Sequence, residues 1–217
     1  MSPQITLPSE IARVRIPDSA LARKAVDYAF SASSTVVWNH VMRTFVFGSI
    51  VGKAQGARYD EELFFLGAVL HDLGLTGIAH GQERFEVVGA DAAVEFLEKE
   101  GVAPERREVV WDAIALHSSV GIASRKRPEI ALVHIGAGID VMGLQLDRLP
   151  PTLVAETIET LPRLDFKTKF LAQVIETIEP NPQIATMTFL HHTANEHFPG
   201  CPCPSFHHLV KNSPFAE

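Results

Sequence analysis

Cysteine is scarce in this sequence, which has only Cys201 and Cys203 among its 217 residues. A single residue separates them in the segment GCPCPSF, so a bond between them would close no useful loop, and we expect no disulfide framework. Several of the ten histidines crowd the same end of the chain, but this mixture of Cys, His and Pro fits no strong zinc spacing. We therefore expect a packed tail with reduced thiols.

An excess of basic residues is also missing. The chain has 19 Lys and Arg residues against 26 Asp and Glu residues, which gives a net charge of −7 and a sequence pI near 5.8. Nucleic acid is therefore not an expected partner, because binding to it requires many cations to neutralise phosphates. A small-molecule substrate is the expected partner, and the oligomeric state stays open, with a homo-oligomer as one option.

Long hydrophobic runs are absent as well. The longest apolar stretches, such as residues 63–70, are far shorter than the roughly 18 residues that a membrane span needs. The opening segment has no apolar run that would serve as a signal peptide. We expect a protein that does not contact a membrane and that lies in the cytoplasm.

No segment combines sustained alternation with β-branched residues and hairpin turns, so the sequence predicts an all-α fold. Caps, glycines and prolines mark the expected helix ends. We predict one domain over residues 1–217, with an extended arm over about 1–17 and an irregular tail over about 180–217. The expected helices cover residues 21–32, 35–56, 61–73, 87–100, 104–119, 128–143, 151–160 and 167–178.

Ionisable residues occur inside three of these apolar helices. His71 and Asp72 end the segment LFFLGAVLHDL, and Asp140 is the only carboxylate in IALVHIGAGIDVMGLQL. His40 lies in VVWNHVMRTFVF and shares a helical face with Arg43. An unpaired buried carboxylate costs several kcal/mol, so each needs a cation, a metal or a proton.

Two imidazoles and two carboxylates form a ligand set that suits one divalent metal ion, Zn²⁺ first, with Fe²⁺ or Mn²⁺ as alternatives. Each residue also has a purely structural interpretation. His40 is then a core histidine with satisfied hydrogen bonds, and Asp140 is a helix cap beside Gly138 and Gly143. The combination favours the metal.

A His, an adjacent His-Asp pair 31 residues later and an Asp 68 residues beyond that pair resemble the signature of the HD superfamily. The resemblance covers roughly residues 20–146. It implies a helical bundle around a single metal site formed by His40, His71, Asp72 and Asp140.

The segments NHVMR, HDLGL, RFEVVGADAA and AIALHSSVGIA are similar to the cyanamide hydratase branch of that superfamily. This similarity implies a metal-dependent hydro-lyase that adds water to the nitrile of cyanamide, giving urea, or to a related small molecule. Leu75 stands where many phosphohydrolase members have Glu, and only Arg43 and Arg84 lie near the motifs to clamp a phosphate. The alternatives are a phosphohydrolase acting on a nucleotide or small phosphate ester, and a non-catalytic metal-stabilised protein.

His117, at the predicted end of its helix, is the candidate that would give a proton to the nitrile nitrogen, because imidazole titrates near neutral pH. It has two other interpretations: a residue that favours the negative end of a helix dipole, or a ligand of a second metal together with His80. Candidates for outer contacts or substrate binding are two residues beside His40 and two in the segment ERFEVVGA. Asn39 and Arg43 could hydrogen-bond a carboxylate ligand. Arg84 and Glu86 could pair with each other or orient a ligand histidine, and a solvated helix start is the equal alternative for them.

Overall fold

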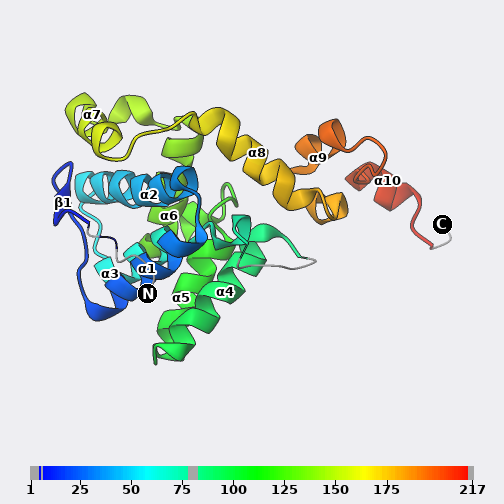
Figure 1. Cartoon of the computed structure of the whole chain (residues 1–217). Coiled ribbons are helices and arrows are strands. Elements are labelled where there is room, and N and C mark those ends of the chain that lie inside the picture. Colours follow the sequence, from blue (N-terminus) through cyan, green and yellow to red (C-terminus); the bar gives the residue numbers. More distant parts are fainter. Residues whose placement is uncertain (1–4, 6, 78–82, 215–217) are drawn as a thin grey trace.

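The computed structural model describes residue 5 and the ranges 7–77 and 83–214. Regular structure in these ranges is almost entirely helical, which confirms the all-α prediction (Figure 1). The α-helices are α1 (Ala20–Ala32), α2 (Thr35–Ala54), α3 (Glu61–Leu70), α4 (Phe85–Lys99), α5 (Pro104–Ala115), α6 (Pro128–Met142), α7 (Pro151–Thr160), α8 (Phe166–Ile178), α9 (His191–His197) and α10 (Phe206–Lys211). Short 3₁₀ turns are η1 (Leu73–Leu75), η2 (Ala123–Arg125), η3 (Leu146–Arg148) and η4 (Pro182–Ala185).

Side-chain caps set the first three helix starts. Ser19, Ser34 and Asp60 each accept a hydrogen bond from the backbone N–H three residues later. Such a cap satisfies one of the amides that a helix leaves unpaired at its start. At the other end of α6, Gly143 takes a left-handed conformation with φ of 71°, which glycine adopts without strain.

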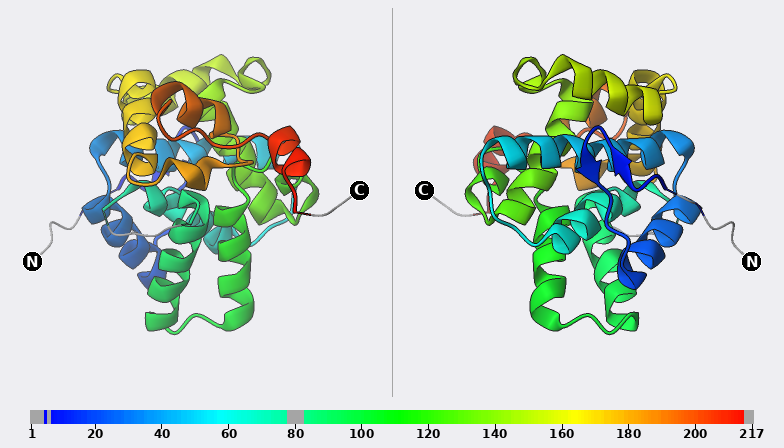
Figure 2. Two further views of the ribbon diagram at one scale, coloured as in Figure 1. Left: turned by 90° about the vertical axis from the view of Figure 1, so that its right-hand side faces the viewer. Right: turned by 90° about the vertical axis from the view of Figure 1, so that its left-hand side faces the viewer.

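Helix α2 lies between two groups of helices. Helices α7 and α8 cover one side of α2, and α1 and α3 lie on the other (Figure 1). Helices α4 and α5 form an antiparallel pair that projects from the rest of the molecule (Figure 2). Every residue from Leu63 to Leu70 in α3 is buried, so the apolar run that is too short for a membrane span forms the centre of the core.

Both predicted terminal segments contain more regular structure than expected. The predicted extended arm includes the antiparallel strands β1 (Glu10–Ile11) and β2 (Val14–Arg15). The predicted irregular tail includes η4, α9 and α10, because a second apolar cluster with the buried Cys203 gives the tail its own packing. Among the residues described in the tail, no three metal-binding side chains come together.

Two predicted helices end three or more residues earlier than expected, and both ends matter for the site. Helix α3 stops at Leu70, so His71 and Asp72 lie in the turn that follows it. Helix α5 stops at Ala115, and His117 therefore lies beyond the helix. His80, the predicted companion of His117 in the alternative with a second metal ion, lies outside the described residues. In the described part of the chain, no helix combines the length and the apolar character needed to cross a membrane.

Helices α2 and α6 approach each other closely at Gly136. A Cβ atom built there would lie 2.1 Å from the backbone oxygen of Thr44 in α2. Backbone atoms cannot move aside as a flexible side chain can, so a larger residue has to push the helices apart. This contact brings His40 and Asp140, one turn from Thr44 and Gly136, within reach of each other.

Gly136→Ala should therefore lower the free energy of unfolding by about 1–3 kcal/mol, the usual cost of overpacking. Alanine is the better helix former by about 1 kcal/mol, so a loss must come from the contact and not from helix propensity. Urea denaturation measures the change. Gly200→Ala is the control, because a Cβ there meets nothing within 4 Å. Equal stability of the two variants would contradict the close approach.

Candidate metal centre

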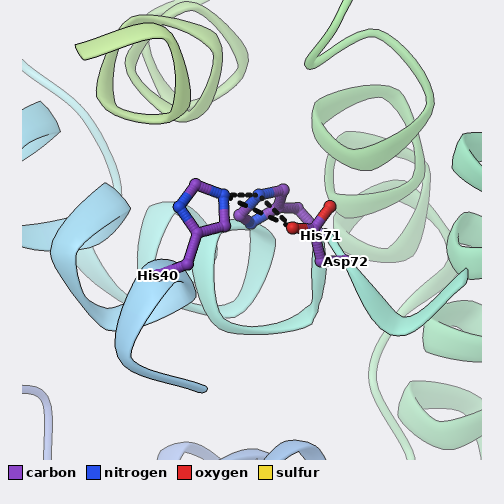
Figure 3. A group of neighbouring side chains, drawn as sticks. All are labelled: His40, His71 and Asp72. Atoms are coloured by element: carbon purple, nitrogen blue, oxygen red, sulfur yellow. Dashed lines mark hydrogen bonds and ion pairs between the residues drawn. The ribbon is translucent and has the colours of Figure 1, made fainter. Parts of the chain in front are cut away.

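Three predicted ligands converge in the core. His40 comes from α2, and His71 and Asp72 come from the turn after α3 (Figure 3). The Nε2 atoms of the two histidines are 3.2 Å apart. The Oδ2 atom of Asp72 lies 3.3 Å from Nε2 of His40 and 3.4 Å from Nε2 of His71. All three residues are at most 2% exposed.

Hydrogen bonds on the far side of each ring direct both Nε2 atoms into this cluster. The Nδ1 atom of His71 donates to the carbonyl oxygen of Ala68 at 2.7 Å. The Nδ1 atom of His40 donates to the carboxylate of Asp140, also at 2.7 Å. Because a neutral imidazole carries one proton, Nε2 of each ring is then a lone-pair donor. Burial, and after it the electrostatic influence of the neighbouring His40, lower the pKa of His71 to about 3, so the His71 ring is neutral near pH 7.

The cluster fits a divalent metal ion. The Oδ2 atom of Asp72 is buried and has no hydrogen-bond partner among the described residues. Two donors that each lie about 2.05 Å from one tetrahedral metal ion are about 3.3 Å apart, close to all three distances here. Two imidazole nitrogens and one carboxylate oxygen form a set that zinc, iron and manganese accept. Burial raises the pKa of Asp72, which is the cost that a bound cation would offset.

Asp140, the fourth predicted ligand, lies apart from this cluster. Its carboxylate contacts the opposite side of the His40 ring and binds two arginines. Arg43 donates through Nε to Oδ1 at 2.7 Å and through a terminal nitrogen to Oδ2 at 2.8 Å, and Arg163 donates to Oδ1 at 2.7 Å. Burial raises the pKa of Asp140, but the hydrogen bonds from His40 and Arg43 outweigh it and hold that pKa below its usual range.

Two further residues of α2 that the sequence analysis singled out, Asn39 and Arg43, bind the turn between α7 and α8. Arg43 donates to the carbonyl oxygens of Leu161 and Pro162, and Asn39 donates to Pro162 as well. Asn39 therefore binds a backbone carbonyl and not a carboxylate. The consequence is that the start of α8 lies directly over His40.

Aromatic rings of α8 cover the site. The rings of Phe166 and Phe170 lie 5.3 and 5.1 Å from that of His40, measured between centroids. The guanidinium of Arg163 lies 4.5 Å above Phe166 in a cation–π arrangement. Sequence reasoning did not identify these three residues, because none belongs to a motif or stands alone in an apolar helix. The only signal is their position in an RLDFKTKF segment, where Arg and Phe are three residues apart.

His117 borders the cluster without joining it. Its Nε2 lies 3.7 Å from Oδ1 of Asp72, the carboxylate oxygen that faces away from His40 and His71. Its Nδ1 donates to the carbonyl oxygen of Ile114 at 2.7 Å, the same three-residue pattern that orients His71. Burial and the neighbouring His71 lower the pKa of His117 to about 4. The Nε2 lone pair of His117 therefore points toward the site.

Arg84 and Glu86 pair with each other at 2.7 Å at the start of α4. Glu86 is buried and accepts a second bond from the hydroxyl of Ser118, the residue next to His117. Burial raises the pKa of Glu86, but the bonds from Arg84 and Ser118 outweigh it and lower that pKa. The pair connects α4 to the turn that carries His117. His134, a residue not singled out from the sequence, supports the same turn by donating to the carbonyl oxygen of His117 at 2.6 Å.

The fold and the site together define a helical protein with a buried His-His-Asp centre suited to a divalent cation. The HD domain family model matches residues 37–159, more than half of the chain, and the chain belongs to this family. HD domains bind divalent metal ions and are mostly metal-dependent hydrolases. Membership of this family therefore supports the expectation that the protein is an enzyme. No curated protein matches the chain. Arg163 and the two phenylalanines over His40 lie beyond the matched region.

Replacing Arg43 should test how strongly the fold depends on the charges around this centre. Arg43→Met should lower the free energy of unfolding by about 3–5 kcal/mol, because it removes one partner of a buried ion pair. Arg106 is the control, since it also binds two carboxylates but is 37% exposed. Arg106→Met should cost at most about 1 kcal/mol. If denaturant titrations give similar losses in the free energy of unfolding for both variants, the buried ion pair contributes no more to stability than the exposed one.

Proposed function

We propose that this protein is a metal-dependent hydratase that adds water to the nitrile of cyanamide or of a related small molecule. The observation that carries the proposal is the pairing of the arginines. Each of the three arginines around the centre, Arg43, Arg84 and Arg163, is bound to a carboxylate of the protein itself. The similarity of four sequence segments to the cyanamide hydratase branch points the same way.

A phosphate ester needs positive charge directed at the transferring group. Arg43 has no exposed side-chain surface, and its guanidinium donates hydrogen bonds to Asp140 and to two backbone carbonyl groups. Arg163 forms an ion pair with the same Asp140 carboxylate, and Arg84 forms one with the buried Glu86. A neutral nitrile requires no such cations, so this arrangement favours hydration over phosphoryl transfer.

The position three residues after Asp72 supports the same choice. Leu75 is 2% exposed and packs in an apolar cluster with Phe85 and Ile178. An acid at that position would have to be buried among these side chains at a cost of several kcal/mol. The surroundings of the centre therefore supply apolar walls, which suit a small uncharged substrate.

Residues of this chain have distinct roles in the proposed reaction. His40, His71 and Asp72 would hold the metal ion, which when bound polarises its ligands and lowers the pKa of water. His117 lies on the other side of Asp72 and carries a proton between the attacking water and the nitrile nitrogen. Addition of one water across the carbon–nitrogen triple bond balances with no other reactant. The apolar cover from Phe166 and Phe170 excludes bulk water from His40.

The reaction class is tested by urea production from cyanamide. Protein loaded with zinc should form urea, and protein treated with a chelator should form none until zinc returns, because the proposed chemistry depends on the metal. Colorimetric urea detection measures the product. A parallel assay uses p-nitrophenyl phosphate and nucleotides, which we expect to be poor substrates. Efficient dephosphorylation without urea formation would replace this proposal with a phosphohydrolase.

His117→Gln tests the proton transfer. Glutamine is close in size and polar but does not exchange a proton near neutral pH, so turnover should fall by roughly 10² to 10⁴ with metal content and melting temperature unchanged. His192→Gln, in the exposed part of α9, is the control and should keep full activity. Recovery of the His117 variant with added zinc would instead make His117 a ligand, and a low melting temperature with a near-normal rate would make it structural.

A further inference from the structure

A cavity separate from the metal centre lies where the N-terminal hairpin meets α2 and the start of α7. Its volume is about 500 Å³, within the usual range for sites that bind small ligands. Strand β1 contacts α7 and β2 contacts α2, so the hairpin forms one wall beside the end of α2 (Figure 1). Ile50, in another wall, lies about 15 Å along α2 from His40 by the usual rise per residue. None of the three proposed metal ligands lines this cavity.

Most of the wall is apolar. Its apolar side chains come from the hairpin, the last turns of α2 and the segment that leads into α7, and they include Val14, Ile50, Val51, Leu149 and Leu153. Each CH₂ group of a ligand buried against such a wall contributes about 0.8 kcal/mol, or about a fourfold change in affinity. The wall therefore favours a ligand with an aliphatic part.

The charged residues at this cavity all carry the same sign. Arg13, Lys53 and Arg148 are exposed residues that line it, and together they form its cationic rim. No Asp or Glu is among the lining residues. Arg148 donates to the neutral side chain of Gln145 at 3.2 Å, and none of the three cations forms an ion pair with a carboxylate in the described part of the chain.

Unpaired cations are concentrated at this position. Eleven of the 19 Lys and Arg residues form ion pairs with described carboxylates. The cationic rim contains three of the remaining eight. The cavity beside Leu75 has the opposite character, because Glu83, Glu176 and Glu179 line it and no Lys or Arg does so among the described residues. The charge of the rim is therefore a local feature of a chain whose net charge is −7.

The backbone on two sides of the cavity is held in a costly conformation. Among the described residues, six without a glycine's freedom have positive φ, and three of these line this cavity. They are Ala12 at 46°, Arg13 at 61° and Gln145 at 57°. Such conformations persist where the surrounding structure requires them. Here they shape the two segments that carry Arg13 and Arg148.

We infer that this cavity binds an aliphatic carboxylate, with the alkyl chain against the apolar wall and the carboxylate group at the cationic rim. Like charges that border one cavity repel each other, and a bound anion offsets that cost. The planar guanidinium groups of Arg13 and Arg148 also match the two oxygens of a carboxylate. This site shares no residue with the proposed metal centre, so it stands or falls separately from the proposed function.

Isothermal titration calorimetry of the whole protein with octanoate tests the inference. Octanoate should bind once per chain with a Kd below about 1 mM. The uncharged 1-octanol should bind at least about tenfold more weakly, because it makes no charge-assisted hydrogen bonds. Butyrate, with four fewer CH₂ groups, should show no saturation over the same range. The inference is overturned if octanoate does not saturate, or if octanoate and 1-octanol bind equally well.

Arg148→Gln tests the cationic rim and should weaken octanoate binding about tenfold, the usual effect of losing one charge-assisted hydrogen bond. Arg125→Gln is the matched control. Arg125 is also exposed, is also the last residue of a 3₁₀ turn, and precedes α6, whereas Arg148 follows that helix. The control should bind octanoate as the unmodified protein does, and both variants should keep the melting temperature. Equal weakening in both variants would reduce the effect to net charge and contradict the site.

Ala54→Gln tests the position of the alkyl chain. Ala54 is exposed and lines the cavity, so a longer side chain occupies the space without removing a packed group, and octanoate should bind at least about tenfold more weakly. Ala155→Gln, at an exposed position of α7 outside the cavity, is the control and should leave binding unchanged. Treatment with a metal chelator should also leave it unchanged. Full binding by the Ala54 variant, or loss of binding with the chelator, would place octanoate elsewhere and overturn the inference.

Discussion

The buried ion pair between Arg43 and Asp140 is the interaction on which the rest of the site depends. Neither side chain has exposed surface, so each charge would be very costly without the other. The pair joins α2 to α6, and the remaining donors of Arg43 fix the turn at Leu161 and Pro162. One guanidinium thus sets the position of three chain segments around His40. Its removal would affect both the fold and the orientation of that ring.

The helices and the three residues of the cluster could be predicted from sequence for physical reasons. A cap such as Ser34 and a glycine such as Gly143 act on the backbone beside them, so their effect is local and visible in the sequence. An ionisable group within or beside an apolar helix must find a partner in the core, and this argument identified His40, His71 and Asp72. These arguments need no knowledge of how distant segments meet.

The arrangement around Asp140 could not be predicted in this way. Asp72 and Asp140 look alike in sequence, since each is a carboxylate in apolar surroundings. Only tertiary structure shows that one is saturated by arginines and the other is not. Arg163 comes from a polar segment, and it reaches the site through left-handed backbone at Leu164 and Asp165, which sequence preferences disfavour.

The carbonyl groups that hold His71 and His117 are local to these residues, whereas the group that holds His40 is not. Each carbonyl belongs to the last turn of the helix that precedes its histidine, where backbone oxygens lack helical partners. These two rings are therefore oriented by contacts with their own helices. His40 is oriented by a residue 100 positions away. The ring direction of His40 thus depends on the docking of α2 against α6, whereas the ring directions of His71 and His117 do not.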